Sequence, residues 1–125
     1  MQRVVVRLGC FVFLLMSLVC CEGEVRGEEV WPGTKGTWNG FVRHDFEFRG
    51  KPVLVIEPRD VAKGKPWVWH GEFFGHKPVP DVALLGRGFH VVHVAYPDQF
   101  GSPAAVALWD ELYRELTEKH GLGKK

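Results

Sequence analysis

Two short, largely apolar runs constrain the fold of this 125-residue chain more than any other feature. The first covers residues 67–69 (WVW), and the second covers residues 89–95 (FHVVHVA). Neither follows a strict apolar–polar alternation, which is typical of strands buried on both faces, as in a parallel sheet. Parallel neighbours need a crossover, and residues 80–85 between the runs have the composition of a short helix. The pattern therefore predicts a strand–helix–strand unit with a right-handed crossover.

The flanking segments extend this unit on its N-terminal side. Residues 37–48 alternate weakly, and residues 52–56 (PVLVI) form a second apolar run. Between them, residues 49–51 (RGK) break the pattern. This order predicts a β-hairpin, in which Pro52 is tolerated as the first residue of its strand.

Helix boundaries are marked by capping residues. Asp81 is expected to cap the short helix, and Gly86 or Gly88 to end it in a left-handed conformation. A final helix is predicted to begin at the N-cap Ser102 and to stop at Gly121. Its apolar stripe has a spacing of 3.6 residues and consists of Ala105, Leu108, Trp109, Leu112 and Leu116. The expected fold class is α/β, with a hairpin followed by β-α-β-α.

The N-terminus has the layout of a secretory signal peptide over residues 1–21. Arg3 and Arg7 precede an apolar run at residues 8–19, and a polar segment follows. The run is shorter than the roughly 20 residues that cross a bilayer, so no stable membrane span is expected after processing. Export to the periplasm or the extracellular space is the predicted localisation, and a lipid attached at Cys20 or Cys21 is a less favoured variant. Residues 22–36, charged and rich in glycine, are expected to form a flexible segment.

Charge and cysteine content exclude several classes of function. Removing the leader leaves 14 Lys and Arg against 15 Asp and Glu, alternating without runs. This balance does not favour nucleic acid or an anionic membrane as a partner. All three cysteines, Cys10, Cys20 and Cys21, lie in or beside the leader. We therefore expect neither a disulfide nor a cysteine metal site in an exported domain, and no cofactor.

Ser102 is the only serine after the leader, so serine catalysis within this chain would have to use it. Its surroundings (FGSPA) depart from the Gly-x-Ser-x-Gly elbow that exposes a nucleophile. Pro103 also removes the backbone N–H that an elbow supplies to the oxyanion. We interpret Ser102 as a helix cap.

Six histidines raise the question of a metal site. His90 and His93 are three apart on a predicted strand, so their side chains point to opposite faces. His70 and His76, with Glu72 or Asp81, are the remaining candidate ligands. Their spacing lacks the tight pairing of zinc sites, such as two histidines one helical turn apart, and we predict no metal site.

The tryptophans suggest a different function, in which their rings form a surface that stacks against carbohydrate on an exported protein. The candidates are Trp31, Trp38, Trp67 and Trp69. Core packing is the commoner use of such residues in so small a domain. A small secreted binding or interaction domain with an aromatic surface is therefore the alternative function for this chain.

Three segments resemble the N-terminal half of an exported α/β-hydrolase of the esterase or lipase kind. Residues 85–92 (LGRGFHVV) are similar to the junction of helix A and strand 4, and residues 98–102 (DQFGS) to the turn after strand 4. Residues 67–74 (WVWHGEFF) lie where strand 3 of that family meets its oxyanion loop. The resemblance assigns residues 37–125 to an N-terminal half-domain that stops before the strand carrying the nucleophile.

This resemblance implies roles for few residues. Oxyanion donors of the family include a backbone N–H just after strand 3, matching Gly71, Glu72 or Phe73 here. Asp98 follows strand 4 and is expected to cap a turn, because the family's acid comes after the nucleophile. Nucleophile, acid and base have no counterparts, so the ancestral activity, ester hydrolysis by serine, is not expected from this chain alone. The substrate is not implied.

The family's strand order also implies an unprotected sheet edge. Its strand 3 lies between strands 4 and 5, and strand 5 has no counterpart here. The strand at Trp67 and Trp69 would then be an apolar edge, which is prone to pairing and aggregation. Self-association, or pairing with a missing half, is expected through this strand.

Overall fold

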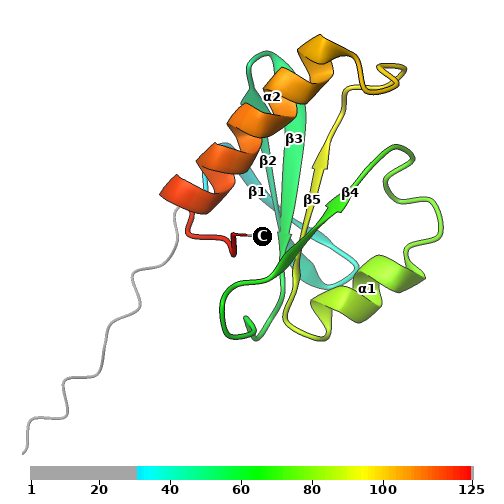
Figure 1. Ribbon diagram of the computed structural model, residues 1–125. Helices are drawn as coiled ribbons and strands as arrows, with labels where there is room; N and C mark the ends of the chain where they lie inside the picture. The colour runs from blue at the N-terminus through cyan, green and yellow to red at the C-terminus, as the bar shows by residue number, and fades with distance from the viewer. Residues whose placement is uncertain (1–30, 125) are drawn as a thin grey trace, which may run out of the picture.

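The computed structural model describes residues 31–124, which form one five-stranded sheet with helices on both faces (Figure 1). The elements along the chain are β1 (Thr34–Trp38), β2 (Phe41–Phe48), β3 (Lys51–Glu57), β4 (Trp67–His70), α1 (Val79–Leu85), β5 (His90–Val94), α2 (Pro103–Arg114) and the π-helical turn η1 (Glu115–Lys119). Mixed α/β content agrees with the predicted class.

Strand order in the sheet is β1-β2-β3-β5-β4. The three N-terminal strands form an antiparallel meander, and β3 pairs antiparallel with β5. Only β4 and β5 are parallel, and α1 connects them. The strand–helix–strand unit is thus present, with β4 at the edge of the sheet.

The N-terminal hairpin is in fact a three-stranded meander, because the segment 37–48 contains a tight turn. Asn39 and Gly40 have φ of 47° and 79°. Positive φ at both central residues is what a type I′ hairpin turn requires, and Asn-Gly is its commonest sequence. The prediction that residues 22–36 are flexible is wrong for residues 34–36, because β1 begins at Thr34. Residues 22–30 lie outside the described part.

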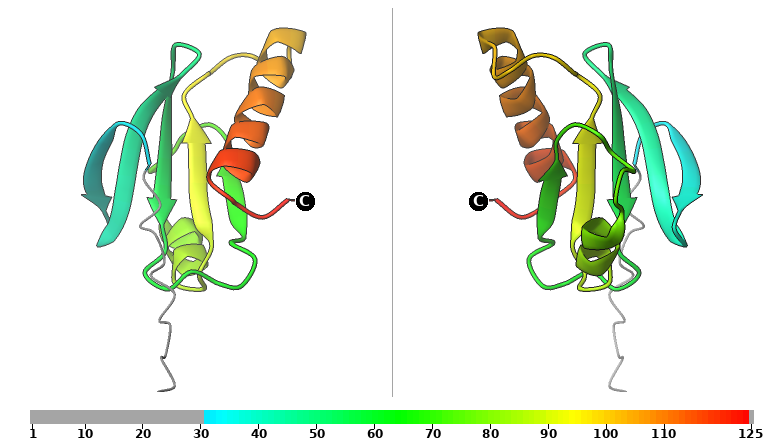
Figure 2. Two further views of the ribbon diagram at one scale, coloured as in Figure 1. Left: turned by 90° about the vertical axis from the view of Figure 1, so that its left-hand side faces the viewer. Right: turned by 90° about the vertical axis from the view of Figure 1, so that its right-hand side faces the viewer.

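Side chains of the central strands alternate between two separate hydrophobic clusters. Val53 and Val55 of β3 face the cluster beneath α2, which contains Leu112 and Leu116. Ile56 of β3 faces the smaller cluster beneath α1. Figure 2 shows the two helices on opposite sides of the sheet. Burial of β3 and β5 on both faces explains their apolar sequences.

Helix ends differ in part from those predicted. Asp81 does not cap α1, whose N-cap is Pro78 without a side-chain hydrogen bond. Of the two candidate glycines, Gly86 is right-handed with φ of −63°, and Gly88 has φ of 87°. Ser102 is the N-cap of α2, and its Oγ accepts a hydrogen bond from the backbone amide of Ala105 at 3.3 Å.

Candidate functional site

Polar side chains line one face of the sheet near the carboxyl ends of β4 and β5. The register aligns Asp45 with Leu54, Leu54 with His93, and His93 with His70. Paired residues share a face, so these four side chains form one row across four strands. Open α/β sheets bind ligands at the carboxyl ends of their strands. We therefore take this row and the loops beside it as the candidate site.

A buried acid–histidine pair joins α1 to β4 at one end of the row. Asp81 is 5 % exposed. Its Oδ2 lies 2.9 Å from Nδ1 of His70, without the alignment of a hydrogen bond. A carboxylate is rarely buried unless it is paired, so this contact accounts for an acid on the inner face of α1. The capping role predicted for Asp81 fails because its side chain points toward the sheet.

The His93 ring contacts the backbone of His70 on the neighbouring strand and stacks against an aromatic ring. Its Nδ1 lies 3.1 Å from the carbonyl oxygen of His70, which can only accept. Nδ1 therefore carries the proton, and in the neutral ring Nε2 is the acceptor. The ring of Phe74 stacks on His93, with centroids 5.4 Å apart and planes at 25°. Phe74 also meets His70 edge-on at 5.4 Å.

The loop that carries Phe74 to this position has an irregular backbone. Phe73, Gly75 and Lys77 have φ of 62°, 86° and 53°. A non-glycine residue in this region costs roughly 1–2 kcal/mol, which must be offset elsewhere. Phe74 packs against His93 and Trp38, which ties the loop to the sheet.

The three candidate oxyanion residues all lie in this loop. Gly71, Glu72 and Phe73 are exposed, and the Phe73 side chain is 78 % exposed. Oxyanion donors act most strongly where water is excluded, and the oxyanion role of these three amides stays a prediction. The carboxylate of Glu72 instead accepts a hydrogen bond from the backbone amide of Asp98 at 3.0 Å, joining the loops after β4 and β5.

Asp98 and Ser102 both lie in the second of these loops. Asp98 has φ of 58° within a turn, where its backbone rather than its carboxylate makes the contact to Glu72. The Ser102 hydroxyl donates to Oε1 of Gln99 at 3.3 Å as well as capping α2. These contacts commit the hydroxyl to the start of the helix.

The candidate metal ligands are not gathered around one point. His70 pairs with Asp81, Glu72 contacts the other loop, and His76 is exposed. Within residues 31–124, no group of three or more His, Cys, Asp or Glu side chains could hold a metal ion. His90 and His93 lie on opposite faces, as their spacing predicts: His90 packs beside Trp31 and His93 beside Phe74.

The four candidate tryptophans do not form a platform. Trp31 and Trp67 are 6 % and 4 % exposed and belong to the cluster beneath α2. Trp69 packs against that same cluster, whereas Trp38 packs on the opposite face of the sheet. Core packing, the favoured use of these tryptophans, is confirmed for Trp31 and Trp67, and the four residues share no common surface for stacking a sugar.

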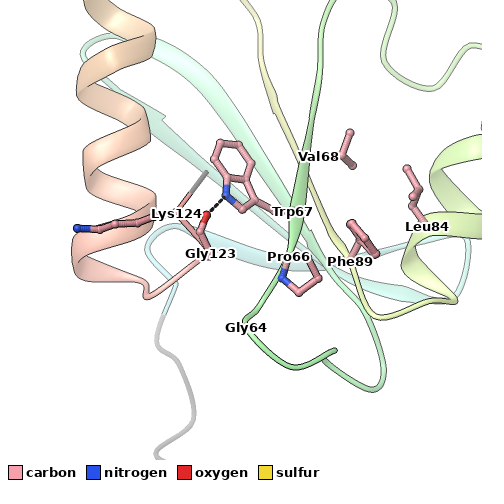
Figure 3. A pocket seen from close by; sticks show the side chains of 8 residues that line it. All are labelled: Gly64, Pro66, Trp67, Val68, Leu84, Phe89, Gly123 and Lys124. Carbon is pink, nitrogen blue, oxygen red and sulfur yellow. Dashed lines mark hydrogen bonds between the residues drawn. The ribbon is translucent and has the colours of Figure 1, made fainter.

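A hollow of about 410 Å³ lies beside the start of β4 (Figure 3). Val68, Leu84 and Phe89 line one side, and the C-terminal segment lines the other. Gly123 donates its amide to the carbonyl of Lys65 at 2.9 Å and accepts from the Trp67 indole at 2.9 Å. The chain's own C-terminal segment thus lies against the outer side of the sheet where β4 begins.

Comparisons with known proteins found no match: no family model, no curated protein and no solved structure is similar to this chain. Among the described residues, no helix is long and apolar enough to cross a membrane. The predicted signal peptide and the two cysteines considered for lipid attachment lie outside residues 31–124.

Proposed function

We propose that this chain is an exported α/β-hydrolase-like protein of serine-hydrolase descent that does not hydrolyse esters by itself. The observation that supports this most is the order of the strands. An antiparallel meander leads into a parallel pair, and the strand that resembles strand 3 of the family, β4, lies outside the one that resembles strand 4, β5. This is the arrangement that the family's strand order requires of its N-terminal half.

The absence of activity is proposed from the state of the candidate residues. The only serine among the described residues is hydrogen-bonded at the start of α2. The three residues that resemble the oxyanion loop are exposed, and the Glu72 carboxylate among them accepts a hydrogen bond from the backbone amide of Asp98. Donors of this kind act on charge that develops during covalent attack, so without a nucleophile they contribute no turnover.

As part of this proposal, β4 is the surface through which the chain pairs with another strand. It has a strand neighbour, β5, on one side only. Its sequence, WVWH, contains none of the lysines, prolines or bulges that protect edge strands. Gly123 covers the carbonyl of Lys65 just before the strand begins. A strand added along β4 would therefore compete with the C-terminal segment at that end.

Gly123→Ala is expected to strengthen self-association, because a Cβ at this position would lie 2.6 Å from the carbonyl oxygen of Gly64. The segment must then move away from the β4 edge. The two hydrogen bonds that Gly123 makes stabilise the monomer by roughly 1 kcal/mol each. Losing them would lower the protein concentration at which half of the chains are associated by about tenfold or more. Sedimentation equilibrium over a concentration series measures this midpoint.

Gly36→Ala is the matched control, because it makes the same change in β1, at the opposite edge of the sheet. A Cβ there has nothing within 4 Å, and the association midpoint should stay at the wild-type value. Equal midpoints for both variants, or monomers throughout, would argue against pairing through β4.

A further inference from the structure

A small hollow of about 270 Å³ lies along the polar row, the row of Asp45, Leu54, His93 and His70 described above, on the face of the sheet that carries α1. Leu54 lies between Asp45 and His93 in the register, so these two side chains flank it on neighbouring strands. Arg43 and Phe74 also line the hollow. Strands β2 and β5 are two strand spacings apart, about 10 Å, and Leu54 between them also lines the hollow.

The polar groups that line the hollow include hydrogen-bond donors and acceptors, and their charges sum to zero. Arg43 donates to both carboxylate oxygens of Asp45, at 2.6 and 2.8 Å. The Asp45 side chain is still 45 % exposed, so its remaining lone pairs are accessible. His93 supplies Nε2 as an acceptor, since Nδ1 is committed to the His70 carbonyl. Charges of Arg43 and Asp45 cancel, which favours a neutral ligand over an ion.

An aromatic ring forms another part of the wall. Phe74 stacks on His93 and lies 6.0 Å from the guanidinium of Arg43. It is carried by the irregular loop of residues 71–78, in which Phe73 and Lys77 have positive φ values. Backbone strain of this kind is concentrated at ligand-binding sites. The ring presents an apolar surface beside hydrogen-bonding groups.

We propose that this hollow binds a single cyclic polyol, such as a monosaccharide. Hydroxyl groups would donate to the Asp45 carboxylate and to Nε2 of His93 and accept from Arg43, while the C–H face of the ring packs on Phe74. The volume lies just below the range of about 300–1,000 Å³ of typical ligand pockets, which restricts the ligand to one ring. An apolar ligand would leave Nε2 of His93 without a hydrogen bond and would remove water from the Asp45 carboxylate, which is costly.

The test is a titration of the intact chain with D-glucose, D-galactose, D-mannose and myo-inositol, followed by NMR of the histidine and phenylalanine ring protons. At least one of them should shift the His93 and Phe74 resonances saturably, with a Kd of about 1 mM. Asp45→Asn should weaken binding by about tenfold, the value of one charge-assisted hydrogen bond.

Glu47→Gln is the matched control, because Glu47 lies two residues further along β2 on the same face and does not line the hollow. Its affinity should equal that of the wild type. His93→Asn retains a donor for the His70 carbonyl but removes Nε2, and should weaken binding as Asp45→Asn does. The proposal is overturned if none of the four compounds gives saturable shifts. Equal affinities for Asp45→Asn and Glu47→Gln would also overturn it.

Discussion

Leu116→Ala is expected to destabilise the protein by about 2–5 kcal/mol, the range for deleting a buried leucine. Leu116 lies in η1 and is fully buried in the cluster beneath α2, together with Leu112 and Leu122. Its carbonyl also accepts the backbone amide of Leu122 at 3.1 Å, so the residue ties the C-terminal segment to the helix. Domains of this size have a total stability of about 5–15 kcal/mol, so the loss would be a large fraction.

Urea unfolding followed by tryptophan fluorescence measures this effect. Val106→Ala is the control, because Val106 lies on α2 and is 42 % exposed. Its free energy of unfolding should change by less than about 0.5 kcal/mol. A Leu116→Ala variant as stable as Val106→Ala would show that α2 and η1 do not pack on the sheet as described.

Gly88→Ala is expected to be nearly as damaging, for a different reason. Gly88 has φ of 87°, and a Cβ there would lie 2.5 Å from the backbone nitrogen of Ala62 and 2.8 Å from the carbonyl oxygen of Asp60. Ala62 also donates its amide to Gly88 at 3.1 Å. The left-handed conformation alone costs about 1–2 kcal/mol with a side chain, and the clash must shift the loop before β4 as well.

Gly86→Ala provides the comparison two residues earlier. Gly86 is right-handed at the end of α1, and the nearest atom to a Cβ is 3.4 Å away. Alanine is a better helix former than glycine by about 1 kcal/mol, so this variant should be neutral or slightly more stable. Thermal melts of the two variants should shift in opposite directions or differ by several degrees. Equal melting temperatures would contradict the left-handed turn at Gly88.

The central strands could be predicted from the sequence because strands buried on both faces consist of nearly continuous apolar runs. The apolar residues of β3 and β5 alternate between the cluster beneath α2, which holds Val53, Val55, Val92 and Val94, and the cluster beneath α1, which holds Leu54, Ile56 and Val91. Ser102 and Pro103 mark the start of α2 through local chemistry alone, the serine as a cap and the proline where no amide bond is lost. Such features depend on few distant contacts.

The turn at Asn39 and Gly40 was predictable but missed. Its dipeptide is the strongest short-range hairpin pattern, and it divides the segment 37–48 into β1 and β2. Weak alternation across the whole segment concealed the boundary. Because β1 is an exposed edge strand, it has no run of apolar residues to distinguish it from a loop.

The polar row could not be predicted, because it depends on strand register. Asp45, His93 and His70 come from three strands that only the fold aligns. Asp81 resembled a helix cap in sequence, and its pairing with His70 follows from the way α1 lies on the sheet. Phe74 reaches His93 only through a loop with three positive φ values, two of them at non-glycine residues.

Ester turnover tests the proposed function most directly. The full chain, purified and assayed with para-nitrophenyl acetate and butyrate, should show no hydrolysis above that of a heat-denatured sample. A fluorophosphonate, which modifies activated serines, should leave no label on the protein. Hydrolysis that is abolished both by the fluorophosphonate and by Ser102→Ala would contradict the account, because it would make the residue that caps α2 a working nucleophile.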